Sequence, residues 1–389
     1  MGKVEQHQAV VVGAGSAGLA TAAELQRRGF EVLLLERAAA LGTSWRARYP
    51  ELRLNSWRVM SRLQGLRLPR HCGRYPSRDD FVAYLERFAA HHRLRVRAGT
   101  TLERVDCAQG GWRLATSAGP IGTRYLVIAT GWDAVADLPR WPGLDRFQPL
   151  LIHAAAFAGA ASYRDLEVLV VGLGNSGIDI AGHLVRAGAR VTVSMRTPPN
   201  LARRDILGLP GQPLLAFLSD RTPTPLADLS FALVQRLLFG DLSQHGIPRP
   251  PLGVYANFRQ RLRNPAIDDG FVAALKQGHC RVVDQVLELT STEVVLIDGT
   301  RLRPDAVICA TGYRRGLEPL VGHLGVLRPD GVPYCHRGAP EHPAAPRLYF
   351  AGMWGQFSGQ IRLGPQHARR IARAAGRDRR SAVQGSSTA

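Results

Sequence analysis

The chain has 389 residues, of which 45% are hydrophobic, so it is long enough for two or three globular domains with buried cores. Its formal net charge of +19 comes almost entirely from arginine. The arginines are scattered, without a dense basic block or interleaved stacking aromatics, so we expect no nucleic-acid partner. No apolar run approaches the roughly 18 residues of a membrane span. The segment before Val10 is too polar for a signal peptide, and we expect a cytoplasmic protein without stable membrane insertion.

A strand, a glycine turn and a helix follow one another at the start of the chain. Residues 9–12 are apolar, residues 13–18 read GAGSAG, and a helical pattern follows. In such a turn the glycines allow the bend, the approach of a pyrophosphate and the packing of the helix. A second strand, 32–35, ends at a carboxylate that could bind ribose hydroxyls, although a turn without function is the alternative. The predicted cofactor residues are Gly13, Gly15, Ser16, Ala17, Gly18, Glu36 and Arg37.

The same pattern recurs in the middle of the chain, with a strand at 168–171, the turn GLGNSG at 172–177, a helix, and a strand at 190–193. The position equivalent to Glu36 is Met195, followed by Arg196. A carboxylate there would repel a 2′-phosphate, whereas arginine can pair with it. We therefore predict FAD at the first turn and NADPH at the second, unless Arg196 is an ordinary solvated side chain. The predicted NADPH residues are Gly172, Gly174, Asn175, Ser176, Gly177 and Arg196.

Two further apolar runs, 125–131 and 306–312, each end in Ala-Thr-Gly. They are expected to lie beside the cofactors where the chain passes between the nucleotide domains, although two buried strands with a turn would look alike. The residues assigned to the cofactor sites are Ala129, Thr130, Gly131, Ala310, Thr311 and Gly312.

These elements predict an α/β fold with two Rossmann-like dinucleotide-binding domains, the NADPH domain being inserted into the FAD domain. The expected ranges are 1–150 for the first part of the FAD domain and 160–300 for the NADPH domain, with a helical insertion at 201–265. The FAD domain then resumes over 301–376, and 377–389 form a flexible tail. The resumed part contains a strand at 348–352, a helix at 365–375 with Pro365 in its first turn, and two predicted cofactor residues, Gly352 and Gly359.

Residues 147–157 resemble the fingerprint FxGxxxHxxx(Y/F) of the flavin-containing monooxygenases. Phe147, His153 and Phe157 match it, Pro149 replaces its glycine, and Baeyer–Villiger monooxygenases have tryptophan where Phe157 stands. The stretches 42–45, 174–177, 249–253 and 265–268 are similar to the YUCCA-like branch, and the resemblance covers nearly the whole chain.

This resemblance implies an NADPH- and O2-dependent enzyme that forms a hydroperoxyflavin and oxygenates a small soft nucleophile: nitrogen, sulfur, or an activated carbonyl such as a 2-oxo acid. It implies that Asn55 lies at the reactive edge of the flavin and the nicotinamide as the catalytic side chain, although a loop asparagine bonded to backbone is the alternative. His153 is favoured as a structural linker over a proton-transfer group. The resemblance also assigns Thr43, Ser44 and Trp45 to cofactor binding.

Other interpretations stay open. The apolar segment 201–242, with a helical run at 225–239, is expected to cover the substrate channel, but a core helix, a homodimer surface or a peripheral membrane contact would also fit. The five cysteines lack CxxC and metal-ligand spacing, so we expect buried, reduced thiols and no metal. The rival functions are an NADPH-dependent flavin reductase or oxidase without oxygen transfer, and a redox-sensing protein that holds both cofactors without turnover.

Overall fold

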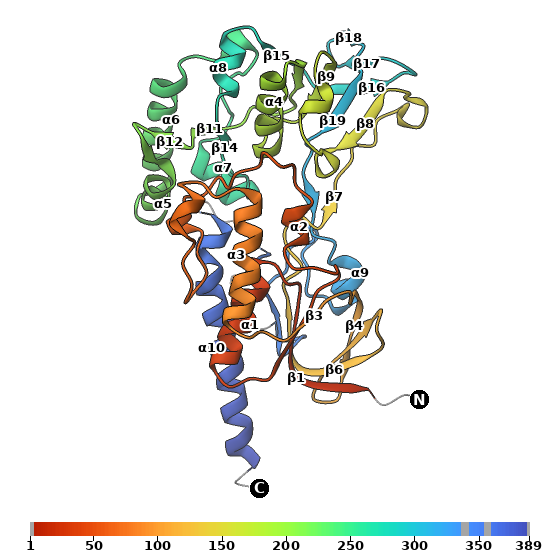
Figure 1. Cartoon of the computed structure of the whole chain (residues 1–389), viewed down its shortest axis with the longest axis vertical. Helices are drawn as coiled ribbons and strands as arrows, with labels where there is room; N and C mark the ends of the chain where they lie inside the picture. The colour runs from red at the N-terminus through yellow and green to blue at the C-terminus, as the bar shows by residue number, and fades with distance from the viewer. Residues whose placement is uncertain (1–3, 336–341, 354–358, 387–389) are drawn as a thin grey trace. The chain divides into compact units, whose positions relative to one another are not determined.

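The computed structural model describes residues 4–335, 342–353 and 359–386 (Figure 1). The chain divides into two compact units. Unit 1 comprises Met1–Arg46, Arg58–Val135 and Tyr313–Ala389, and unit 2 comprises Ala47–Trp57 and Ala136–Gly312. One unit is therefore inserted into the other, as the sequence predicts, but the boundaries differ. The segment Ala47–Trp57 belongs to unit 2, and the chain returns to unit 1 at Tyr313 rather than at 301.

Unit 1 is built on a parallel sheet that starts with β1 (Glu5–Val12), α1 (Ser16–Arg27) and β2 (Val32–Leu35). The strand order is β3-β2-β1-β6-β5-β4, and β21 also pairs with β6. The first four strands and β21 run parallel, whereas β5 and β4 form an antiparallel extension. The other strands are β3 (Val96–Arg97), β4 (Leu102–Ala108), β5 (Gly111–Thr116), β6 (Ile121–Ile128) and β21 (Leu348–Phe350).

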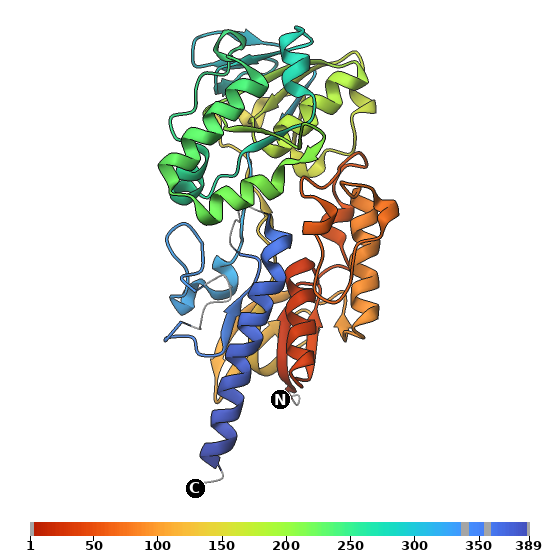
Figure 2. The ribbon, with the colours of Figure 1, turned by 90° about the vertical axis from the view of Figure 1, so that its left-hand side faces the viewer.

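The helices of unit 1 include α1 and α10 (Gln360–Ser386), which lie side by side in both views (Figures 1 and 2). The helix α3 (Arg78–His91) begins with a capping box between Ser77 and Asp80. Shorter helices are α2 (Thr43–Arg46) and α9 (Glu318–Val321).

The C-terminal helix is longer than the sequence predicts. Pro365 lies inside α10 rather than in its first turn, and residues 377–386 continue the helix instead of forming a tail. Ile371 and Ala375 are fully buried on its inner face. Beyond them, Asp378 accepts a hydrogen bond from the Tyr125 hydroxyl at 2.5 Å, and Arg379 donates to the carbonyls of Arg28 and Gly29 behind the end of α1. These anchors hold a segment whose arginine-rich composition resembles a solvated tail.

Unit 2 contains a parallel sheet with the order β15-β10-β9-β19-β8. Successive side chains of its strands point to opposite faces of the sheet, and different elements pack on each face. Val168 and Val170 pack towards α4 (Asn175–Ala187) and α8 (Phe271–Lys276), whereas Leu169 and Val171 pack towards an antiparallel meander of β16, β17 and β18. The strands are β8 (Leu150–His153), β9 (Glu167–Val171), β10 (Arg190–Ser194), β15 (Cys280–Val283), β16 (Val286–Leu289), β17 (Val294–Leu296), β18 (Arg301–Leu302) and β19 (Ala306–Cys309).

The expected return at 301 is wrong because β19 is an inner strand of this second sheet, held between β9 and β8. Short strands β7 (Val135–Ala136) and β20 (Tyr313–Arg314) lie at the two crossings between the units.

The predicted helical insertion is present in unit 2. It contains β11 (Leu201–Arg203), β12 (Asp205–Ile206), β13 (Leu209–Pro210), α5 (Gly211–Arg221), α6 (Thr224–Phe239), α7 (Val254–Arg261) and β14 (Ala266–Asp268). The inner face of α6 is buried through Phe231 and Phe239, but Leu229 and Leu237 on its outer face are 68% and 77% exposed. The core-helix interpretation is therefore wrong for this outer face. A small apolar pocket with a cavity volume of about 30 Å³ lies between β11, α5 and α6.

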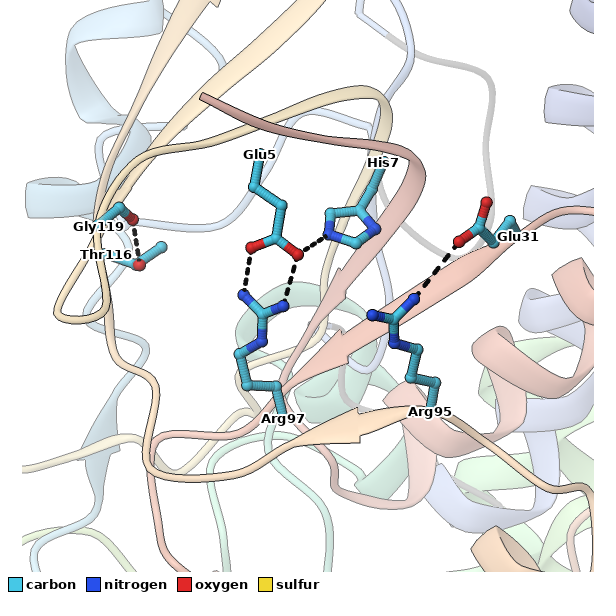
Figure 3. A network of polar contacts seen from close by, with 7 residues as sticks. All are labelled: Glu5, His7, Glu31, Arg95, Arg97, Thr116 and Gly119. Atoms are coloured by element: carbon cyan, nitrogen blue, oxygen red, sulfur yellow. Dashed lines mark hydrogen bonds and ion pairs between the residues drawn. The ribbon is translucent and has the colours of Figure 1, made fainter. Parts of the chain in front are cut away.

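An ion-pair network ties the inner strand β1 to the edge strand β3 in unit 1 (Figure 3). The carboxylate of Glu5 accepts two hydrogen bonds from Arg97, at 2.6 and 2.8 Å, and one contact from His7 at 2.7 Å. Hydrogen bonds from Arg97 and His7 lower the pKa of Glu5 from its ordinary 4.5 to about 2.

Replacing Glu5 with glutamine is expected to cost stability in a pH-dependent way. Because the pKa of Glu5 is lower in the folded chain, the charged carboxylate stabilises the fold fully above pH 4.5, and this contribution is lost as the pH falls towards 2. Denaturant midpoints of wild type and E5Q should therefore converge between pH 4.5 and 2, with E103Q on the same sheet as the control. A difference that stays constant over this range would contradict the assignment.

Candidate functional site

The first glycine turn connects β1 to α1 in unit 1. Gly13 has φ +103°, and a Cβ there would lie 2.5 Å from the carbonyl oxygen of Ala129. A Cβ on Gly18 would lie 1.8 Å from the carbonyl oxygen of Gly13, whereas a Cβ on Gly15 would meet nothing within 4 Å. Contacts within the protein therefore exclude a side chain at the first and third glycines. Only the second faces open space, which is where a pyrophosphate would approach the backbone.

The second turn, between β9 and α4 of unit 2, repeats this geometry. Gly172 has φ +105° and its Cβ would lie 2.5 Å from the carbonyl oxygen of Ala310. On Gly177 a Cβ would lie 1.8 Å from the carbonyl of Gly172, and Gly174 again faces open space. Each Ala-Thr-Gly run thus packs against one glycine turn, and each run lies just before a crossing between the units, as the sequence predicts. The second run, however, belongs to unit 2.

Polar groups around the first turn fit a bound dinucleotide. The carboxylate of Glu36 accepts hydrogen bonds from the backbone N–H groups of Ala14 at 2.8 Å and Ala38 at 3.0 Å, so it lies beside the turn with acceptor capacity left. The Thr130 hydroxyl is buried and has no hydrogen-bond partner among the described residues. Gly352, with φ +71°, lies so close to α1 that a Cβ would be 2.8 Å from that of Ala17. A buried hydroxyl without a partner in the described part of the chain, next to Gly13 of the turn, can bond a polar ligand.

The other predicted cofactor residues of unit 1 have local contacts or are exposed. The Thr43 hydroxyl bonds the carbonyl of Ala40, and the Trp45 ring packs edge-on against Phe81 of α3. Arg37 and Ser44 are exposed. Gly359 directly precedes α10 and has φ +98°, but residues 354–358 before it lie outside the described part of the chain. The cofactor roles of these residues stay predictions.

Asn55 lies at the second turn. Its Nδ2 donates to the Asn175 Oδ1 at 3.4 Å, and its Oδ1 accepts from Arg204 at 3.2 Å. Asn175, the first residue of α4, also accepts from the Ile267 backbone N–H and donates to the Pro265 carbonyl. Arg204 in turn pairs with Asp269 at 2.9 Å. The amide of Asn55 is therefore attached to the helix end that follows the second glycine turn.

Arg196 is exposed directly after β10, next to the buried Met195. Burial and the neighbouring positive charges of Arg196 and Arg261 lower the pKa of Arg263. The charge of Arg263 therefore interacts with that of Arg196, which the sequence interpretation missed because Arg263 follows 67 residues later, near the end of the helical insertion. Two guanidinium groups that repel one another suit a doubly charged anion such as a 2′-phosphate.

His153 has a structural position. Its Nδ1 accepts a hydrogen bond from the Ala155 N–H at 3.0 Å, so Nε2 carries the hydrogen and bonds the Gly312 carbonyl at 2.9 Å. The ring is 5% exposed, and it ties the end of β8 to the crossing at Gly312. Phe157 is buried in the core of unit 2. Both observations favour the structural interpretation of this motif.

All five cysteines are free thiols in the structure; Cys107 is exposed and Cys335 only half-buried, so the expectation of buried thiols is wrong for these two. His71, Cys72 and Asp80 bring one ligand atom each within 4.8 Å of one another. The Asp80 carboxylate already accepts hydrogen bonds from the N–H and hydroxyl of Ser77, so we assign it to the cap of α3. Among the described helices, none is both long and apolar enough to span a membrane.

Comparisons with known proteins agree with this geometry. The family model of the pyridine nucleotide-disulphide oxidoreductases matches residues 10–206. The chain is 35% identical over 323 residues to the indole-3-pyruvate monooxygenase YUCCA1 of Oryza sativa subsp. japonica, which covers 82% of this chain and 80% of that protein.

Solved structures share the fold. A flavin-containing monooxygenase from Stenotrophomonas maltophilia superimposes with a TM-score of 0.74 at 22% identity, covering 96% of this chain and 98% of that one. Cyclohexanone monooxygenase from Rhodococcus sp. Phi1, bound to NADP+, gives a TM-score of 0.75 at 18% identity over 97% and 85% of the two chains. The chain therefore belongs to the flavin-dependent monooxygenases, in the branch of the YUCCA enzymes, and its cofactors are a flavin and a pyridine nucleotide.

Proposed function

We propose that unit 1 binds FAD, that unit 2 binds NADPH, and that the enzyme uses NADPH and O2 to add one oxygen atom to a small nucleophilic substrate. The observation that carries this proposal is that the two turns have matching backbone geometry, whereas the residues after the following strand differ in charge. The strand after the first turn ends at the carboxylate of Glu36, whereas the strand after the second leads to Met195 and Arg196. A carboxylate suits free ribose hydroxyls and an arginine suits a 2′-phosphate.

The residues have distinct tasks in this proposal. Gly15 and Gly174 let the two pyrophosphates approach the backbone, and the N-termini of α1 and α4 supply partial positive charge. Arg196 and Arg263 hold the 2′-phosphate. The flavin supplies the redox and oxygen chemistry, which the protein supports by positioning and by excluding water. Asn55 offers an amide donor and acceptor beside the nicotinamide nucleotide, where it can hold that nucleotide or hydrogen-bond the reacting oxygen.

The names of the relatives indicate which substrates to test first. Several of them are named indole-3-pyruvate monooxygenases, so an aromatic 2-oxo acid is the first substrate to test, with a small amine and a sulfide beside it. A reductase or oxidase without oxygen transfer would consume NADPH and release only hydrogen peroxide. A redox sensor would hold both cofactors without turnover.

The experiment is a turnover under 18O2 with NADPH and each of the three substrates. One atom of 18O in the product, for every NADPH consumed, supports the monooxygenase. NADPH consumption that yields hydrogen peroxide with every substrate would instead favour the oxidase, and no consumption would favour the sensor.

Replacing Asn55 with alanine is expected to uncouple the reaction. NADPH oxidation should continue while the product falls and hydrogen peroxide rises, by about tenfold or more, because small misplacements at a reacting centre have large effects. The yield of product per NADPH measures this, with N257A on α7 as the matched control. Coupling in N55A equal to that of the wild type would remove Asn55 from the reaction.

A further inference from the structure

The segment Ala47–Trp57 leaves unit 1 and lies against unit 2 before the chain returns at Arg58. It contacts polar side chains spaced by four residues along α4, namely Asn175, Asp179 and His183, which therefore share one face of that helix. Asn55 lies at the first of them, next to the glycine turn. Tyr49 contacts Asp179 and His183, which lie about one and two turns further along the helix.

The contacts of Tyr49 are buried and specific. Its side chain lies in the core of unit 2 with 4% exposure, and its hydroxyl donates a hydrogen bond to the carboxylate of Asp179. Its ring packs edge-on against Phe157 at 5.4 Å and His183 at 5.7 Å. Burial and the charge of Asp179 raise the pKa of Tyr49, so the hydroxyl keeps its proton and remains a donor.

Asp179 also has a second neighbour on its own helix. His183 Nε2 lies 3.6 Å from its other oxygen, and Arg186 contacts the His183 Nδ1 at 3.1 Å. A hydrogen bond to a charged acceptor is about twice as strong as one between neutral groups. Tyr49 and Asp179 are thus the firmly held end of the segment.

The end with Asn55 is held less firmly. Asn55 is exposed, and its two hydrogen bonds are 3.4 and 3.2 Å long. Two residues later the backbone N–H of Trp57 bonds the Gln212 side chain at 2.7 Å. The position of Asn55 therefore depends on anchors on both sides of it, and Tyr49 is the buried hydrogen-bonded anchor before it.

We propose that Tyr49 and Asp179 are positioning residues for the oxygenation. Their hydrogen bond fixes the segment Ala47–Trp57 along α4 and so keeps Asn55 at the second glycine turn, where the pyridine nucleotide binds in the proposed function. This inference rests on the proposed function. It assigns to neither residue a contact with substrate or cofactor. Loss of the hydrogen bond leaves the glycine turn intact and loosens only the chain that carries Asn55.

The test uses Y49F, which removes one hydroxyl and keeps the ring. Its matched control is Y163F, because Tyr163 lies in the same core, 7% exposed, with its ring 5.7 Å from Phe157. In Y49F, the yield of product per NADPH is expected to fall at least about threefold through misplacement of Asn55, with the KM for NADPH nearly unchanged. Hydrogen–deuterium exchange of the peptide containing residues 47–57 should become faster in Y49F and not in Y163F.

A second pair of variants guards against simple misfolding. D179N retains an oxygen that accepts from the tyrosine and should keep most of the coupling, whereas D179A should behave like Y49F. Equal coupling in Y49F and Y163F, or equal exchange of residues 47–57 in both, would overturn the inference. The exchange measurement needs no turnover: if the wild type forms no oxygenated product, the proposed function fails while the exchange still reports on the Tyr49–Asp179 bond.

Discussion

Replacing Gly15 with alanine is expected to give a folded protein that has lost most of its flavin. The backbone of Gly15 is extended, at φ −77° and ψ −177°, and its Cβ would meet no protein atom within 4 Å. Only a ligand against the turn would contact the added methyl. An extra methyl in a filled site costs about 1–3 kcal/mol, which corresponds to about 5- to 150-fold weaker binding. The ratio of flavin absorbance to protein absorbance after purification, and a flavin titration, measure the effect.

The control is Gly18→Ala in the same turn. Its Cβ would lie 1.8 Å from the Gly13 carbonyl oxygen, so this variant should lose thermal stability as well as flavin. If G15A keeps its full flavin content and affinity, no dinucleotide lies against this turn.

Replacing Arg196 with alanine is expected to weaken NADPH far more than NADH. A hydrogen bond to a charged group contributes about 1.5–3 kcal/mol, so the KM for NADPH should rise about 10- to 150-fold. NADH has no 2′-phosphate, so its KM should change little. Steady-state kinetics with both nucleotides test this directly.

R263A should show the same selectivity, and R259A on the exposed side of α7 is the control for a general loss of positive charge. Equal losses for both nucleotides in R196A would remove this residue from the phosphate site. The binding of both would then depend on the net charge alone.

Much of the fold could be predicted from the sequence because its strongest signals are local. At 13–18 and 172–177, the atoms that exclude a side chain belong to the same turn or to the end of the neighbouring strand in the sheet. The pattern of glycines therefore predicts strand, turn and helix in both units. The missing carboxylate near Met195 is equally local, and it is the basis of the NADPH assignment.

What the sequence could not provide depends on partners far along the chain. The segment that carries Asn55 belongs to unit 2 because Tyr49 bonds Asp179, 130 residues later. The last turns of α10 are helical because Asp378 and Arg379 bond Tyr125 and the end of α1. Arg263 approaches Arg196 only after the insertion has folded. No periodicity or spacing within a short window contains these contacts.

In the proposed function, one chain holds a flavin and a reducing nucleotide that react with each other. Anaerobic mixing of the purified yellow protein with one equivalent of NADPH, followed by the flavin absorbance, tests it most directly. We expect complete bleaching with NADPH, much slower bleaching with NADH, and recovery of the absorbance when O2 is admitted. A protein that remains colourless after incubation with FAD, or whose flavin NADPH does not bleach, would contradict it.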